Sequence, residues 1–235
     1  MTPEPERVVI VAAQNEAPRI GAALDALAET LPGARLMVAD DASTDGTQQE
    51  AMRHGAWLIS RRRPHGKGGN VTAAAEAALS DAEVALAELA LVCDGDLGAT
   101  AGALAGLIEP VRRGECDLAI ASFARRVGGG FGVALRFARW AIRSRSGYEA
   151  GAPISGQRAM RTETLRELLP FAAGYGMEIG MTVDADPPGR RVCEVELDLE
   201  HRATGRTLGG FAHRARQLRD FTKVWWARRG PADAG

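Results

Sequence analysis

Short apolar segments alternate with amphipathic segments along the first half of the chain. The pattern predicts strands at 7–13, 34–40, 56–60, 89–94 and 116–122. Between them it predicts helices at 18–31, 45–55 and 101–114, and over 66–79 a glycine-rich loop that runs into a further helix. Strands and helices that alternate in this way form βαβ units. We therefore expect an α/β protein with a mixed, mostly parallel sheet flanked by helices, whose ligands bind beyond the carboxyl ends of the strands.

The second half of the chain is less regular. We expect a loop at 125–132, a basic helix at 133–145, a loop with a short strand at 153–161, a helix at 174–185 and a strand at 190–199. A basic amphipathic helix follows at 208–230. The predicted organisation is one domain with halves 1–122 and 123–208, a C-terminal helix at 209–229 and a disordered tail at 230–235.

Charge and cysteine content narrow the class of protein. The formal net charge of the 235 residues is −1, but residues 1–110 hold 8 Lys/Arg and 16 Asp/Glu, whereas residues 111–235 hold 21 and 14. No apolar run approaches the roughly 20 residues of a membrane-spanning helix. Cys93, Cys116 and Cys193 lack metal-site spacing, and no signal peptide is recognisable. We therefore expect reduced thiols in a cytoplasmic protein.

Two aspartates follow the predicted strand at 89–94 in the string "LVCDGDLGAT". Side chains two residues apart on an extended segment point the same way, so Asp94 and Asp96 would share one face. Two carboxylates at the end of a strand suit a hard cation such as Mg²⁺ or Mn²⁺, which in turn binds phosphates. The alternative is a solvated turn in which Asp96 caps the next helix.

Three further strings carry candidate ligands. In "ADDASTDGT" (39–47), Asp41 can accept hydrogen bonds from a base or ribose, and Asp45 is the better helix cap. In "HGKGGN" (65–70), backbone N–H groups and Lys67 can neutralise a diphosphate, although the string is neither a P-loop nor a dinucleotide fingerprint. His201 follows an alternating strand; it is a structural histidine or a third metal ligand.

Together these strings resemble nucleotide-sugar glycosyltransferases with the GT-A fold. "VVIVAAQNEA" (8–17), "ADDASTDGT" (39–47) and "CDGDL" (93–97) are similar to the broad family 2 pattern. The strings "GKG", "DGDL", "RRVGGG", "PISG", "LLPFAAGYGMEIG" and "EHR" occur in the order found in glucosyl-3-phosphoglycerate synthases and their mannosyl relatives. The likeness covers residues 7–205, and "PFAAGYGMEIG" is its most distinctive part.

The resemblance implies a role for each matching position. The implied donor-binding residues are Ala12, Ala13, Glu16, Asp41, Lys67, Asp94, Gly95, Tyr175 and Glu178. The implied catalytic residues are Glu178, Asp96 and Lys67. Mg²⁺ or Mn²⁺ would be held by Asp94, Asp96 and His201. The acceptor side would be formed by Gly129, Gly130, Ser155 and Gly156.

The sequence departs from the synthases at acceptor positions. Those enzymes have Arg and Thr after the triple glycine, where this chain has Phe131, Gly132 and Val133. They also have Arg and Asn two residues before and after the metal histidine, where this chain has Leu199 and Ala203. We therefore expect a retained UDP-sugar donor and a changed acceptor, either a phosphorylated small molecule or a polyprenyl phosphate.

Basic and aromatic residues gather in the segments 136–145 and 211–229, which include Trp140, Trp225 and Trp226. A basic helix with tryptophan can lie at a membrane interface, so peripheral contact with the inner face of the membrane is one reading. The other is a helix packed on the core or on a second copy in a homodimer, with its arginines solvated. No nucleic-acid-binding module is recognisable.

The predicted activity is metal-dependent transfer of a hexose, first of all glucose, from a UDP-sugar. Likeness to the synthases implies retention of anomeric configuration, whereas the broader family 2 pattern implies inversion. A sugar-phosphate nucleotidyltransferase is the rival enzyme, but "AAQNEAPR" (12–19) lacks the glycine-rich, basic loop expected after its first strand. A non-catalytic nucleotide-sugar-binding relative is the third reading, and Asp94, Asp96, His201 and Glu178 argue against it.

Overall fold

The computed structural model describes residues 6–123, 132–185, 190–200 and 208–228, with the side chains of 208–217 left out. Three sequence predictions lie outside the described residues. They concern the glycine loop with Gly129 and Gly130, the metal-binding role of His201, and the tail at 230–235.

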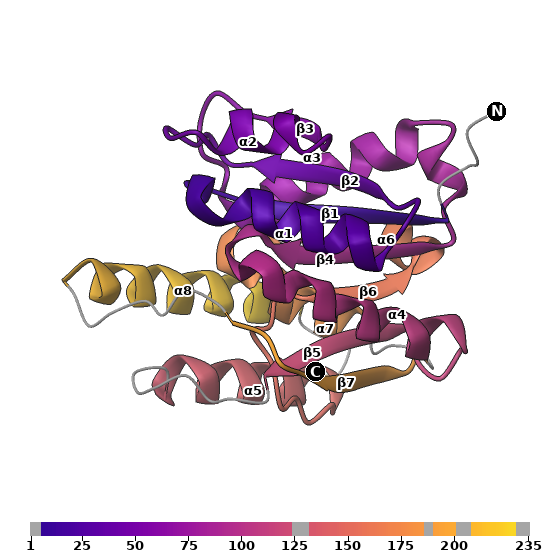
Figure 1. Ribbon diagram of the computed structural model, residues 1–235. Coiled ribbons are helices and arrows are strands. Elements are labelled where there is room, and N and C mark those ends of the chain that lie inside the picture. The colour runs from indigo at the N-terminus through magenta and orange to yellow at the C-terminus, as the bar shows by residue number, and fades with distance from the viewer. Residues whose placement is uncertain (1–5, 124–131, 186–189, 201–207, 229–235) are drawn as a thin grey trace.

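One seven-stranded sheet forms the centre of the molecule, in the order β3-β2-β1-β4-β6-β5-β7 (Figure 1). Its strands are β1 Arg7–Ala13, β2 Arg35–Asp40, β3 Trp57–Ser60, β4 Leu89–Asp94, β5 Leu118–Phe123, β6 Arg158–Arg161 and β7 Val192–Leu197. Strand β6 is antiparallel to both of its neighbours, and the other pairs are parallel. The predicted mixed, mostly parallel sheet is confirmed.

Helices cover both faces of the sheet. They are α1 Ala17–Thr30, α2 Thr47–Arg53, α3 Gly66–Ser80, α4 Ala105–Arg112, α5 Gly132–Ser146, α6 Thr162–Leu168, α7 Met177–Ala185 and α8 Leu208–Ala227. Short 3₁₀ helices lie at η1 Val84–Leu86, η2 Gly95–Leu104 and η3 Gly174–Gly176. None of the described helices combines the length and the apolarity needed to cross a membrane.

The period of two along the strands divides the core into two layers. Val9 and Val11 of β1 pack with Leu24 of α1 on one face, while Val8 and Ile10 pack against α3 and α7 on the other. Because both faces are buried, the strands are almost continuously apolar, as is typical of parallel sheets. A third apolar cluster joins α5, α7 and α8.

Two predicted boundaries are wrong, and both affect the site. Helix α3 begins at Gly66, so Lys67 lies in its first turn and the glycines at 66–69 do not form a loop. The chain turns into η2 directly after β4, so Asp94 ends a strand and Asp96 lies in a 3₁₀ helix. The extended geometry that would align these two carboxylates therefore does not exist.

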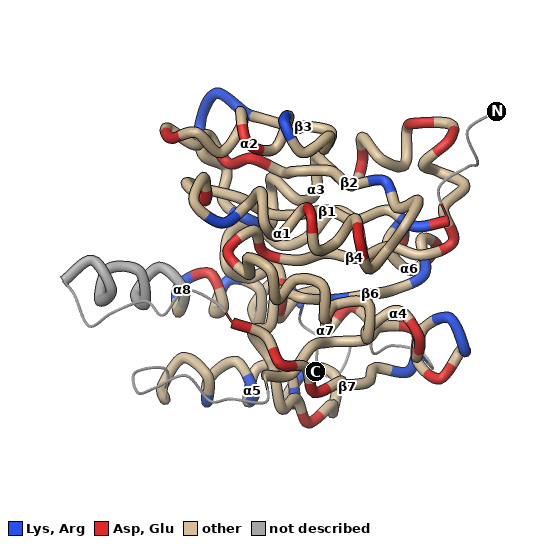
Figure 2. Tube along the Cα trace, in the orientation of Figure 1, with Lys and Arg blue, Asp and Glu red and all other residues tan. Residues whose placement is uncertain are grey.

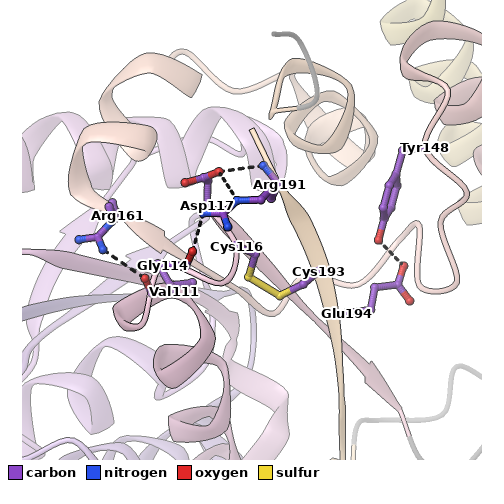
Figure 3. The surroundings of a disulfide bond; sticks show 9 residues. All are labelled: Val111, Gly114, Cys116, Asp117, Tyr148, Arg161, Arg191, Cys193 and Glu194. Atoms are coloured by element: carbon purple, nitrogen blue, oxygen red, sulfur yellow. Dashed lines mark hydrogen bonds and ion pairs between the residues drawn. A yellow bond between two sulfur atoms is a disulfide. The ribbon is translucent and has the colours of Figure 1, made fainter. Parts of the chain in front are cut away.

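The prediction of reduced thiols is also wrong for two of the cysteines. Cys116 and Cys193 form a disulfide although 77 positions separate them in sequence (Figure 3). Parallel pairing of β5 with β7 brings the two segments side by side, and the Cα atoms of Cys116 and Cys193 are 5.9 Å apart. Cys93 is free and buried. Burial, aided by the carboxylate of Asp94, raises the pKa of the Cys93 thiol and keeps it protonated.

Candidate active site

The carboxyl ends of β1, β2 and β4 meet at one edge of the sheet. The register pairs Ala12 with Asp94 across β1 and β4, and Ala13 with Asp40 across β1 and β2. Asp41 follows directly, and its N–H donates to the carbonyl of Ala13 at 2.9 Å. Parallel pairing therefore brings together the positions that the resemblance assigns to the donor.

A lysine between two carboxylates forms the centre of this region. Lys67 Nζ lies 2.5 Å from Asp94 Oδ1 and 2.8 Å from Glu178 Oε1. The Lys67 and Glu178 side chains are 18% and 8% exposed, and that of Asp94 is 31% exposed. Burial disfavours the ammonium, but Asp94 and Glu178 outweigh this and raise the pKa of Lys67 above its ordinary value. Lys67 is therefore a fixed positive charge at the carboxyl edge of the sheet.

The turn before β6 closes on this ion pair network. Gln157 Nε2 donates to Asp94 Oδ2 at 2.9 Å, and Ser155 Oγ donates to Gln157 Oε1 at 3.0 Å. Gly156 lies so close that a Cβ atom there would overlap Lys67 Nζ and Asp94 Oδ2. The predicted acceptor-side positions Ser155 and Gly156 thus lie directly beside Lys67 and Asp94. Sequence reasoning missed Gln157, and its only signal was its place after "PISG".

Asp41 has a structural task that the sequence did not suggest. Its side chain is buried; Oδ1 accepts from the N–H of His65 at 2.7 Å, and Oδ2 from that of Gly66 at 3.0 Å. These amides stand at the start of α3, where a carboxylate is stabilised by unsatisfied N–H groups. Asp41 therefore fixes the helix that carries Lys67. Its predicted contact with the nucleoside remains a prediction.

Asp45 serves two helices, although the N-cap residue of α2 is Gly46 and not Asp45 as expected. Its carboxylate accepts from the N–H of Thr47 at 2.9 Å and from that of Ala17 at 3.2 Å. Glu16 is the N-cap of α1, and its N–H donates to Thr47 Oγ1 at 2.8 Å. The loops after β1 and β2 are thereby held together beside the site.

A buried arginine supports the segment that carries Glu178. Arg158 is fully buried; Nε donates to the carbonyl of Ser155 at 3.0 Å and Nη1 to Thr182 Oγ1 at 2.9 Å. Thr182 Oγ1 in turn donates to the carbonyl of Glu178 at 3.0 Å. Burial lowers the pKa of Arg158 to about 10, against the opposing effect of the Glu178 carboxylate. Arg158 thus links the turn at Ser155 to helix α7. The arginine in "SGQRAM" gave no indication in the sequence of this long-range contact.

A divalent cation fits this site only with oxygens from a ligand. Among residues 6–123, 132–185, 190–200 and 208–228, no group of three His, Cys, Asp or Glu is placed to hold a metal. Asp94 ends β4 and Asp96 follows in η2, so their role as metal ligands remains a prediction, and His201 lies outside those ranges. Mg²⁺ commonly takes one or two protein carboxylates and completes its shell with water and substrate phosphates. The donor set therefore fits a cation that binds together with a phosphorylated ligand.

The fold and the arrangement of charges at its carboxyl edge have the character of a GT-A glycosyltransferase. Residues 8–169 match the family described as Glycosyl transferase family 2, and the chain belongs to this family.

Relatives of known activity fall into two kinds. An undecaprenyl-phosphate mannosyltransferase of Micrococcus luteus is 29% identical over 216 residues, covering 85% of this chain and 86% of its own. A glucosyl-3-phosphoglycerate synthase of Mycolicibacterium paratuberculosis is 30% identical over 239 residues, covering 89% of this chain and 69% of its own.

The solved structures give the same fold. A crystal structure of glucosyl-3-phosphoglycerate synthase from Mycobacterium tuberculosis with Mn²⁺, UDP-glucose and phosphoglyceric acid has a TM-score of 0.71 and 27% identity. The match covers 93% of this chain and 79% of that one. A structure of the same enzyme with Mg²⁺ and UDP has a TM-score of 0.73 and 27% identity, covering 93% and 78%.

Proposed function

We propose that this protein transfers a hexose, in the first instance glucose, from a UDP-sugar to a phosphorylated or otherwise anionic acceptor. It acts with Mg²⁺ or Mn²⁺ and with retention of configuration, as its likeness to the synthases implies. The observation that carries the proposal is the partly buried Lys67 between Asp94 and Glu178, beside the turn at Gly156. A relative of this chain has been solved with UDP-glucose and Mn²⁺ and with UDP and Mg²⁺.

Different residues of the chain act on the diphosphate and on the hexose of the UDP-sugar. Lys67, held in the first turn of α3, binds the diphosphate and offsets the negative charge that develops as UDP departs. Asp94 and Asp96 hold the cation, which supplies further positive charge to the same oxygens when bound. Glu178 and Tyr175, at the start of α7 and in η3, orient the hexose hydroxyls. Asp41 keeps α3, and with it Lys67, in position.

The structure disfavours both alternative functions, the nucleotidyltransferase and the non-catalytic relative. The loop after β1 has no glycine-rich basic segment, because Ala17 already begins α1 and Glu16 is its cap. This disfavours a nucleotidyltransferase. A non-catalytic relative would have no need of a lysine held largely out of solvent between two carboxylates, since such groups are costly to bury. Leu199, which replaces a synthase arginine, is buried in the apolar core and offers nothing to an anion. The acceptor therefore differs from that of the synthases.

The Glu178→Gln variant tests the transfer step. It keeps the size of the side chain but removes the carboxylate that faces Lys67 and the sugar side. We expect turnover, measured as UDP released from UDP-glucose with a polyprenyl phosphate as acceptor, to fall about 100-fold or more. Calorimetric affinity for UDP with Mn²⁺ should stay within about threefold.

Glu163→Gln provides a matched control for this variant. Glu163 also lies in the first turn of a short helix, α6, but it is exposed and away from Lys67. Its substitution should change neither quantity. Unchanged turnover in Glu178→Gln would refute the role of Glu178 in the reaction.

A further inference from the structure

Helices α5 and α8 lie side by side (Figure 1), and both expose large apolar side chains. In the described part of the chain, five large hydrophobic side chains are exposed, and three of them belong to these helices: Val133 (73%), Trp140 (50%) and Trp226 (59%). The rings of Trp140 and Trp225 are 5.1 Å apart, and those of Trp225 and Trp226 are 6.3 Å apart. An aromatic run therefore crosses from one helix to the other.

The exposed side of α8 is a single helical stripe. Arg219, Thr222, Lys223, Trp226 and Ala227 line one hollow of about 450 Å³. Their spacing of i, i+3, i+4, i+7 and i+8 places them on one face of the helix. Phe221 and Val224 lie on the opposite side and are buried. The core thus packs on one face of α8, and the described side chains of the other face are exposed.

This exposed side is positively charged. Helix α5 has basic residues and no acidic residue (Figure 2). Arg143 and Arg219 are 70% and 63% exposed. In the part of α8 whose side chains are described, Asp220 is the only acid, and it is 13% exposed. Glu149 pairs with Arg143, but both side chains are exposed, so the pair is weak and Arg143 can exchange it for another anion. We call the set of exposed residues the aromatic–basic face; it comprises Val133, Trp140, Arg143, Arg219, Lys223 and Trp226.

The helix that carries this face touches the sugar side of the site. Asp220 Oδ2 accepts from the N–H of Tyr175 at 3.4 Å. A Cβ at Gly174 would overlap Asp220, and one at Gly176 would overlap Val224, so α8 packs on the backbone of η3 without intervening side chains. Helix α7 with Glu178 begins at the next residue, Met177. A surface bound at α8 is therefore close to the groups assigned to the hexose.

We propose that the aromatic–basic face binds an anionic lipid bilayer and thereby presents the active site to a phosphorylated lipid acceptor. Tryptophan beside arginine and lysine suits the interface of such a bilayer, where rings sit among headgroups and cations meet lipid phosphates. A second copy of the chain fits less well, because an isologous contact would set the basic face against itself. The part concerning the acceptor rests on the proposed function, whereas bilayer binding does not.

Vesicle flotation with the full chain tests the proposal. We expect the protein to float with vesicles of phosphatidylcholine mixed with phosphatidylglycerol, to remain unbound with phosphatidylcholine alone, and to be released by salt. Trp140→Ser with Trp226→Ser, and separately Arg219→Gln with Lys223→Gln, should each weaken binding about tenfold or more.

Matched controls use the same substitutions elsewhere. Met52 and Leu86 are the other two exposed large hydrophobics, and Arg112 and Arg113 are exposed cations on α4, at the far end of the molecule from α8 (Figure 1). Met52→Ser with Leu86→Ser, and Arg112→Gln with Arg113→Gln, should keep vesicle binding within about twofold. Thermal unfolding of every variant shows whether it is folded.

Three results would overturn the proposal. They are no flotation of the wild-type chain with anionic vesicles, equal losses in face and control variants, or a wild-type dimer in light scattering that dissociates in the tryptophan variant. Calorimetry with UDP-glucose and Mn²⁺ separates failure of the bilayer proposal from failure of the proposed function. Variants of the aromatic–basic face should retain wild-type affinity for UDP-glucose. Vesicle binding without any donor binding would contradict the proposed function and leave the bilayer contact in place.

Discussion

Gly156→Ala is expected to lower turnover about 100-fold or more while leaving the protein folded. The added Cβ would overlap Lys67 Nζ and Asp94 Oδ2. Gly156 needs no left-handed backbone, so the substitution adds a collision rather than backbone strain. Lys67 and Asp94 must move apart to accept the methyl group, and a displacement of this size misplaces the groups that bind the diphosphate and the cation.

The measurement is the UDP-release assay together with thermal unfolding. Gly132→Ala is the control, because a Cβ at Gly132 has no described atom within 4 Å. It should keep wild-type turnover. If Gly156→Ala retained turnover within about threefold of wild type, the close approach of this turn to Lys67 would have no functional meaning.

Lys67→Met is expected to have the largest combined effect on activity and stability. The substitution keeps the length of the side chain and removes the charge between Asp94 and Glu178. Breaking a buried ion pair from one side leaves uncompensated charge, here that of Glu178, and costs about 3 kcal/mol of unfolding free energy. Turnover should fall about 1,000-fold, because the diphosphate also loses its lysine.

The pH dependence of stability gives this prediction a second readout. Asp94 and Glu178 raise the pKa of Lys67 in the folded protein, so its charge contributes stability below the ordinary lysine pKa of about 10.4. This contribution is lost as the pH rises through the folded-state value. The wild-type chain should therefore lose its advantage over Lys67→Met only in strongly alkaline solution, as urea titrations across pH would measure.

Arg113→Met controls for the loss of a basic side chain. Arg113 is exposed at the end of α4 and pairs only with surface acids among the described residues. It should change stability by less than about 0.5 kcal/mol. Equal stability of Lys67→Met and wild type at neutral pH would show that the ion pairs do not hold this site together.

The local sequence pattern was sufficient to predict the strands of the sheet, but not the segments that follow them at its carboxyl edge. Strands β1, β2 and β4 are short apolar runs followed by turn residues, and each lies within a few residues of its predicted position. The boundaries of α3 and η2 were missed because glycines at 66–69 and at Gly95 and Gly98 favour loops when neighbours are ignored. At Gly95 a tertiary contact requires glycine, because a Cβ there would collide with Ile20.

The site residues divide in the same way. Lys67 and Asp94 were candidates from their local strings, Glu178 and Gly156 were assigned by resemblance, and the structure brings all four together. No local signal connects Gln157 with Asp94, or Cys116 with Cys193, because each pair spans more than sixty positions. Such contacts follow from strand order, with β6 inserted antiparallel beside β4 and β7 added beyond β5. Spacing along a single sequence does not contain that order.

Calorimetric titration of the full chain with UDP-glucose, with and without Mn²⁺, tests the central claim most directly. We expect binding that requires the cation and is lost in Asp96→Ala, with UDP giving the same pattern. Lys67→Met should weaken the binding of both ligands. Absence of binding to UDP-glucose and UDP in the presence of Mn²⁺, or binding that is unchanged in Asp96→Ala, would contradict a metal-dependent UDP-sugar site at the end of β4.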